Sequence, residues 1–191
     1  MQKKVTKKSA RHELQFNVAQ LLKEVTGATR TYNLNSKILS KLDDDTTLLS
    51  PISGQVKFLR TGSDILVTGT LETTLQKSCG RCLAQFSTPV SFDLEEQFYP
   101  TVDVATGAAL PLPPEDEDDE ANHIDEQHTL DLLEVIRQDL LLESDGILYC
   151  KPDCKGLCPH CGEDRNLNPC TCEEDEIDSR WVGLLALQLE E

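Results

Sequence analysis

The stretch Ile65-Leu-Val-Thr-Gly-Thr-Leu-Glu-Thr-Thr-Leu75 decides the fold class, because its apolar side chains recur with a period of two. Such alternation predicts a β-strand with one buried face and one exposed face. The preceding Thr61-Gly-Ser-Asp64 predicts a hairpin turn from an apolar run at residues 56–60. A third strand is expected over residues 86–98. These strands predict an antiparallel meander that could curl into a small barrel.

Helical signals flank the meander. Residues 14–18 predict a short strand, and the brief helix that follows is expected to end at Gly27. A later helix is expected to open at Asp131 and Glu134, which resemble a capping pair, and to end at Gly146. A last short helix would be capped by Asp178 and would carry a stripe of apolar residues for core packing.

These elements predict an α+β fold, in which a small antiparallel β-meander or barrel-like domain precedes helices and a cysteine-rich zinc-knuckle segment. Residues 101–128 are rich in proline and acids, so we expect them not to order themselves. The expected organisation is a flexible basic tail at 1–12, a β-rich domain with a CxxC knuckle at 13–100, an acidic linker or loop at 101–128, and a helix, zinc segment and C-terminal helix at 129–191.

Eight cysteines are spaced like metal ligands. In Cys158-Pro-His-Cys161-Gly162 a tight turn can point two thiolates at one ion, and glycine tolerates the positive φ that such a turn often needs. The Cys79-Gly-Arg-Cys82 pair lies between two expected strands, at a hairpin tip. A redox dithiol normally opens a helix, so we rank redox chemistry below metal binding. The candidate ligands are Cys79, Cys82, Cys150, Cys154, Cys158, Cys161, Cys170 and Cys172.

The number of metal ions is open at this point. Eight sulfurs suffice for two structural Zn²⁺ sites, one of which would clip the β-rich domain to the C-terminal segment. A single Zn²⁺ bound by four of the last six cysteines fits the spacing equally well. His160 could be a ligand or could donate a hydrogen bond to a ligand, although a solvent-facing position is the simpler interpretation. His123 and His128 are interpreted as linker residues.

Composition limits the partners. The chain has 191 residues and a net charge of −16, with 38% hydrophobic and 5% aromatic residues. An acidic chain repels a phosphate backbone, so basic protein partners are favoured and any RNA contact should be weak or indirect. We expect no membrane association, because no stretch approaches a transmembrane span. Without an apolar export signal after the basic start, the expected location is the bacterial cytoplasm, with a plastid as the alternative.

Several motifs together resemble the YceD family: Cys79-Gly-Arg-Cys82-Leu83, Leu130-Asp-Leu132, Cys154-Lys-Gly-Leu-Cys158-Pro-His-Cys161-Gly162, Asn166-Leu-Asn168, Cys170-Thr-Cys172 and Asp178-Ser-Arg-Trp181. Ser179 stands where the family usually has proline. The resemblance implies a non-enzymatic factor needed for accumulation of large-subunit ribosomal RNA. One branch of the family keeps the CxxC and lacks the C-terminal cluster, which implies that the β-rich domain carries the shared role and that the cluster stabilises it.

The function expected from the sequence is therefore a non-enzymatic factor in large ribosomal subunit biogenesis, which supports 23S rRNA accumulation or processing through protein contacts. Its partner would be a basic ribosomal protein, a pre-ribosomal particle or an RNA-processing enzyme. The acidic block at residues 115–120 would be the contact, and the lysine-rich residues 3–11 a possible RNA arm. The alternatives are a zinc-stabilised adaptor or nucleic-acid-binding module outside ribosome assembly and, less favoured, a metal or redox enzyme.

Overall fold

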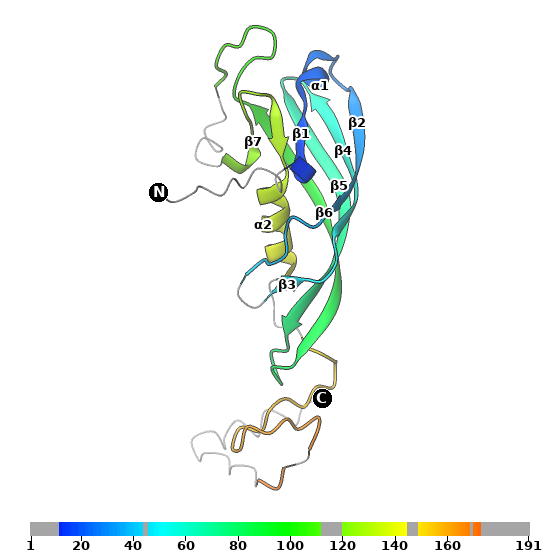
Figure 1. Cartoon of the computed structure of the whole chain (residues 1–191), viewed down its shortest axis with the longest axis vertical. Helices are drawn as coiled ribbons and strands as arrows, with labels where there is room; N and C mark the ends of the chain where they lie inside the picture. The colour runs from blue at the N-terminus through cyan, green and yellow to red at the C-terminus, as the bar shows by residue number, and fades with distance from the viewer. Residues whose placement is uncertain (1–11, 44–45, 112–119, 145–148, 169, 173–191) are drawn as a thin grey trace, which may run out of the picture.

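The computed structural model describes residues 12–43, 46–111, 120–144, 149–168 and 170–172. Strands dominate it, and the largest sheet has six strands in the order β2-β4-β5-β6-β7, with β3 pairing β5. Figure 1 shows a long twisted sheet with helix α2 beside it and the cysteine-rich segment at one end. The strands of this sheet are β2 (Thr29–Ser36), β3 (Thr47–Leu48), β4 (Ile52–Thr61), β5 (Asp64–Ser78), β6 (Gln85–Pro100) and β7 (His123–Ile124).

The expected meander is confirmed at β4, β5 and β6. Thr61 pairs with Asp64 across the expected turn, and Gly62 in that turn has a φ of 85°. The large side chains on the inward face of β5 are buried, namely Ile65, Val67, Leu71 and Leu75. Gly69 occupies an inward position between them, where a Cβ would lie only 2.4 Å from the Gln55 carbonyl oxygen. The strands therefore approach at this point more closely than a side chain would allow.

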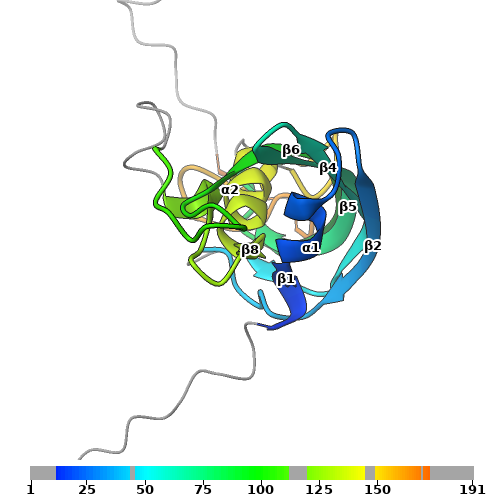
Figure 2. The same ribbon diagram turned by 90° about the horizontal axis from the view of Figure 1, so that it is seen from above.

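The sheet stays open. Within the described residues β2 and β7 are the two ends of the strand order, and no pairing joins them. Seen from above, the sheet curls around α1 (Ala19–Lys23), α2 (Leu133–Ser144) and the small sheet formed by β1 and β8 (Figure 2). The α+β class is thus confirmed as a curled, open meander with its core on the concave side.

That core joins segments far apart in the sequence. Strand β1 (Gln15–Asn17) pairs antiparallel with β8 (Thr129–Asp131), immediately before α2. Leu14, Phe58 and Leu140 are fully buried members of one hydrophobic cluster that includes both sheets and both α-helices. Helix α2 begins at Leu133, two residues later than expected, and Asp131 is the last residue of β8; the Asp131 Oδ1 still accepts the Leu133 N–H at 2.9 Å. Its expected partner Glu134 instead makes a two-pronged ion pair with Arg137.

The structure differs from the expectation that residues 101–128 do not order themselves. On both sides of the undescribed residues 112–119 the chain has regular structure, with a bridge between Val102 and Ala109 and the 3-10 turn η2 (Glu120–Asn122) followed by β7. Ile124 is fully buried, and β7 adds to the sheet parallel to β6. Backbone pairing and one buried isoleucine order these segments despite their polar composition.

Some expectations lie outside the described residues. These are the basic tail at 1–11, all of the acidic block except Glu120, the stop at Gly146 and the last helix after Asp178. Among the described residues no helix is long and apolar enough to cross a membrane.

Candidate metal centres

The tip of the β5–β6 hairpin presents two cysteines. Ser78 pairs with Gln85 at the end of the ladder, and the six residues between them form the turn. In this turn the Cys79 N–H donates a hydrogen bond to the Ala84 carbonyl at 2.9 Å, and the Leu83 N–H donates one to the Cys79 carbonyl at 3.0 Å. Leu83 has a φ of 61°, which lets the chain reverse after the second cysteine. Cys79 and Cys82 are thereby turned toward the same side, and both are buried.

The Cys158–Cys161 pair repeats this backbone geometry. The Cys158 N–H donates to the Glu163 carbonyl at 2.8 Å, and the Gly162 N–H donates to the Cys158 carbonyl at 2.9 Å. Gly162 has a φ of 75°, at the position that Leu83 occupies in the hairpin tip. Two segments with different sequences thus form the same knuckle, which is the local structure expected where two thiolates bind one ion.

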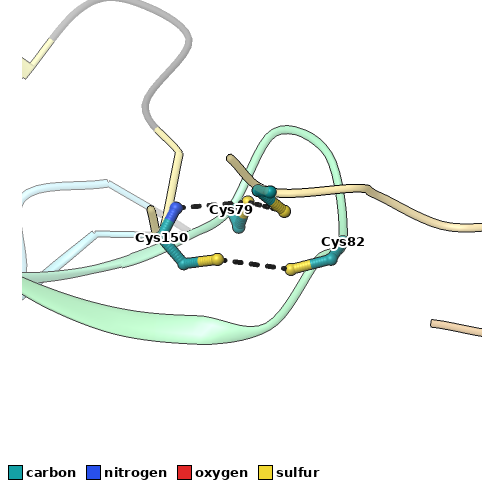
Figure 3. A group of neighbouring side chains, drawn as sticks. Cys79, Cys82 and Cys150 are labelled. Atoms are coloured by element: carbon teal, nitrogen blue, oxygen red, sulfur yellow. Dashed lines mark hydrogen bonds between the residues drawn. The ribbon is translucent and has the colours of Figure 1, made fainter. Parts of the chain in front are cut away.

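The cysteines gather into two groups of four. The first tetrad is Cys79, Cys82, Cys150 and Cys154, and the second tetrad is Cys158, Cys161, Cys170 and Cys172; the sulfurs within each lie within 4.8 Å of one another. In this grouping, two cysteines of the hairpin tip share a tetrad with two cysteines of the C-terminal segment. Figure 3 shows Cys150, on a separate segment of the chain, facing Cys79 and Cys82 at the hairpin tip.

The sulfur spacing of the first tetrad fits a tetrahedral ion. Cys79 Sγ lies 3.8 Å from Cys154 Sγ, and Cys82 Sγ lies 3.7 Å from Cys150 Sγ. Four sulfurs about 2.3 Å from a Zn²⁺ would be separated by about 3.8 Å along each edge of the tetrahedron. All eight cysteines are free thiols. The donor set and its spacing therefore fit a metal ion closed in by four sulfurs.

N–H groups surround the sulfurs of the first tetrad. Cys79 Sγ accepts the N–H groups of Arg81 and Cys150, each at 3.4 Å, and Cys154 Sγ accepts Asn166 Nδ2 at 3.4 Å. Four thiolates around one divalent ion leave a net negative charge, which such donors stabilise. The Arg81 guanidinium lies over the Tyr149 ring at 4.0 Å and donates to the Cys154 carbonyl at 3.0 Å.

The pKa values follow from these contacts. Burial alone would raise the pKa of Cys79, but backbone N–H donors outweigh it and lower the pKa to about 6. In the second tetrad the backbone N–H groups of Cys161 and His160 lower the pKa of Cys158 to about 6 as well. Burial and the neighbouring sulfurs raise the pKa of Cys150 to about 12. All four sulfurs of a tetrad can be thiolates at neutral pH only with a cation between them.

The tetrads differ in exposure. Three members of the first are buried, and they form a small apolar cluster with Phe86 and Leu157 packed against it. In the second tetrad only Cys158 is buried, whereas Cys161 and Cys172 are exposed. The first tetrad is therefore largely buried between the hairpin and the C-terminal segment, and the second lies at the surface.

The histidines lie outside both tetrads. His160 is exposed within the second knuckle and belongs to neither group of candidate ligands. His123 is in β7 and His128 adopts a φ of 58° in the turn before β8, so both belong to ordered structure. Sequence reasoning missed the roles of Arg81, whose side chain ties the hairpin to the C-terminal segment, and of Asn166, whose side chain contacts Cys154 within that segment. The available signal was their position in the sequence, since Arg81 lies within a CxxC motif and Asn166 lies between two cysteine pairs.

The fold and these centres define a class of protein: an α+β chain with two knuckles, in which one cysteine tetrad joins an open sheet to a cysteine-rich segment and a second tetrad lies within that segment. The chain belongs to the YceD family, described as large ribosomal RNA subunit accumulation proteins, whose match covers residues 67–188. That range begins within β5 and includes all eight cysteines.

Curated relatives occur in mycobacteria. Uncharacterized proteins of Mycobacterium tuberculosis and Mycobacterium bovis are each 36% identical over 124 residues, which is 64% of this chain and 55% of the relative. An uncharacterized protein of Mycobacterium leprae is 28% identical over 138 residues, or 71% of this chain and 58% of the relative. The chain thus spans a little over half the length of these relatives. No solved structure matches it.

Replacing Cys158 and Cys161 together with serine should remove one metal ion per chain and loosen residues 155–168, because a structural metal contributes directly to folding. The checks are elemental analysis of the purified protein and tryptic cleavage after Lys155 and Arg165. His160→Ala is the matched control and should keep its metal. Unchanged metal content in the double variant would show that the second tetrad does not bind.

Proposed function

We propose that this chain is a non-enzymatic factor in large ribosomal subunit biogenesis, which supports accumulation or processing of 23S rRNA through contacts with proteins. The observation that carries this proposal is the family match over residues 67–188, which takes in most of β5, all of β6 and α2, and both tetrads. Its partner is a basic ribosomal protein, a pre-ribosomal particle or an RNA-processing enzyme, and the site of action is the bacterial cytoplasm.

Zn²⁺ in both tetrads is part of the proposal, with all eight cysteines as ligands. Four thiolates at tetrahedral spacing suit this ion, and a site closed by four sulfurs has no open position for a substrate or an activated water. The ions therefore stabilise the fold rather than catalyse a reaction. The ion in the first tetrad holds the cysteine-rich segment at the end of the sheet, and the ion in the second stabilises that segment internally.

The exposed face of the long hairpin offers a surface for a basic partner. Glu72, Asp93 and Glu95 are exposed, and their register places all three on the same face of β5 and β6. Asp93 also accepts a hydrogen bond from Thr70 at 2.8 Å, which fixes its side chain. In a chain with a net charge of −16 this face would attract basic protein and repel RNA. It adds to the acidic block at residues 115–120, which remains a candidate contact.

Sedimentation of the tagged chain from lysate tests the function. At low salt we expect the chain to co-migrate with large-subunit precursors, and at high salt to be released, because contacts between exposed charges are screened. Depletion should lower the level of 23S rRNA relative to the small-subunit RNA. Migration only as a free small protein, together with normal 23S rRNA after depletion, would refute the proposal.

Charge variants test the surface. Glu72→Gln, Asp93→Asn and Glu95→Gln together should leave folding intact and reduce the salt-sensitive co-migration, because exposed charges contribute little to folding stability. A control variant removes the same charge elsewhere at exposed positions, namely Glu126→Gln, Asp153→Asn and Glu163→Gln. Equal loss of co-migration in both variants would mean that overall charge, and not this face, attracts the partner.

A further inference from the structure

Asn166 connects the two tetrads. It lies in the loop between Cys161 and Cys170, which are ligand candidates of the second tetrad. Its Nδ2 nevertheless donates to Cys154 Sγ of the first tetrad at 3.4 Å, and its Oδ1 accepts the Lys155 N–H at 2.9 Å. One side chain from the loop of the second tetrad thus holds both a sulfur of the first tetrad and the residue that follows it.

The orientation of Asn166 is fixed by its own loop. Asp164 Oδ1 accepts the Asn166 backbone N–H at 2.9 Å and Asn166 Nδ2 at 2.7 Å. The Asp164 carbonyl in turn accepts the N–H groups of Leu167 and Asn168, each at 3.0 Å. The two hydrogens of Nδ2 are therefore assigned to Asp164 and Cys154, and the amide is in place only while the loop keeps this turn.

A backbone link runs beside this side chain. The Leu157 N–H donates to the Arg81 carbonyl at 3.1 Å, which joins the hairpin tip to the residue before Cys158. Gly156 has a φ of 70°, and a Cβ there would lie 3.0 Å from the same Arg81 oxygen. The chain between the tetrads is thus held close to the hairpin.

We propose that the two tetrads bind metal cooperatively, with Asn166 as the positioning residue that couples them. Metal in the second tetrad holds Cys161 and Cys170, and with them the loop between these residues that aims the Asn166 amide at Cys154 Sγ. An N–H donor there stabilises the metal-bound thiolate, and partners of this kind change metal affinity by about 10–100-fold. Because coupling between binding sites is reciprocal, metal in the first tetrad strengthens the second by the same factor.

A titration of the full chain with Co²⁺ under reducing conditions tests the coupling. Thiolate–cobalt absorption reports the occupied tetrads, and competition with a chelator gives the affinity. Cys158→Ser/Cys161→Ser leaves only the first tetrad. Its affinity should fall by about tenfold relative to the first tetrad of the intact chain, in the range expected for loss of such a partner. Equal affinity with and without the second tetrad would overturn the proposal.

Asn166 itself is tested by substitution. In Asn166→Ala the affinity of the first tetrad should become the same whether or not the second is intact. Asn166→Asp keeps an acceptor for the Lys155 N–H but loses the donor, so it should uncouple the tetrads as the alanine variant does. Asn168→Ala, at an exposed position in the same loop, is the matched control and should retain coupling. Persistent coupling in Asn166→Ala, or equal loss in Asn168→Ala, would refute the role of Asn166.

This inference rests on the metal binding proposed above for both tetrads, but it does not depend on the proposed ribosomal role. Each readout is an affinity or an absorption spectrum of the purified chain, whereas the function is tested by sedimentation and RNA levels. Independent tetrads would leave the ribosomal proposal intact, and a chain without a ribosomal partner would leave the coupling intact.

Discussion

Replacing Cys79 and Cys82 with serine should reduce the metal content from two ions per chain to one and release the cysteine-rich segment from the hairpin tip. The first tetrad joins residues separated by more than seventy positions, as the contact between Cys79 and Cys154 shows. Metal binding by structural sites contributes on the order of 10 kcal/mol in small domains. Without the metal ion of the first tetrad, residues 149–157 should therefore no longer be held in a fixed position.

Elemental analysis and limited proteolysis check this result. Trypsin should cut rapidly after Lys155 in the double variant and slowly in the unmodified chain. Leu83→Ala is the control, since Leu83 lies at the same hairpin tip but is 64% exposed and donates no ligand. Two bound metal ions and unchanged proteolysis in the double variant would show that the first tetrad is not a metal centre.

Leu140→Ala should destabilise the whole sheet domain by about 2–5 kcal/mol, the usual cost of truncating a fully buried leucine. Leu140 is 0% exposed and belongs to the same core cluster as Phe58 in β4. Helix α2 follows the acidic segment in the sequence, so the prediction tests whether it shares the core of the strands that precede that segment.

The matched control is Leu142→Ala. It removes the same atoms from the same helix, but Leu142 is 71% exposed. Surface substitutions of this kind usually change stability by less than about 0.5 kcal/mol. Urea unfolding with both metal ions bound gives both values. Equal, small effects for the two leucines would mean that α2 does not pack on the sheet.

The sequence predicted the parts of the fold that have local signals. The alternation in β5 predicted its buried face, the Thr61–Asp64 turn predicted the first hairpin, and Asp131 predicted the start of α2. Each of these depends on residues within a few positions of one another. Period-two hydrophobicity and side-chain capping are local effects, so one sequence suffices to detect them.

Other elements have no local signal. Strand β2 (Thr29–Ser36) alternates, but its inward residues include Arg30 and Ser36 and only Leu34 is a buried aliphatic residue. It is a strand because eight of its residues pair with β4. The pairing of β1 with β8 joins residues 116 positions apart at Gln15 and Asp131. Tertiary pairing of this kind overrides weak local preference.

The sequence predicted which cysteines are candidate metal ligands, but it did not predict how they group into sites. Cysteine spacing identified two knuckles, and it left open whether four or eight sulfurs bind metal. The choice depends on whether the hairpin tip and the segment at Cys150 meet, which only the folded chain decides. The contacts of Arg81 and Asn166 with Cys154 are also non-local, across 73 and 12 positions.

The central claim is that eight cysteines form two closed four-sulfur sites, the first of which fastens the C-terminal segment to the sheet. X-ray absorption at the zinc edge, measured on the full chain purified under reducing conditions, tests it most directly. The account predicts two zinc ions per chain, each with four sulfurs at about 2.3 Å and no nitrogen or oxygen neighbours. A nitrogen or oxygen ligand in the first shell, or a chain that retains fewer than two ions, would contradict it.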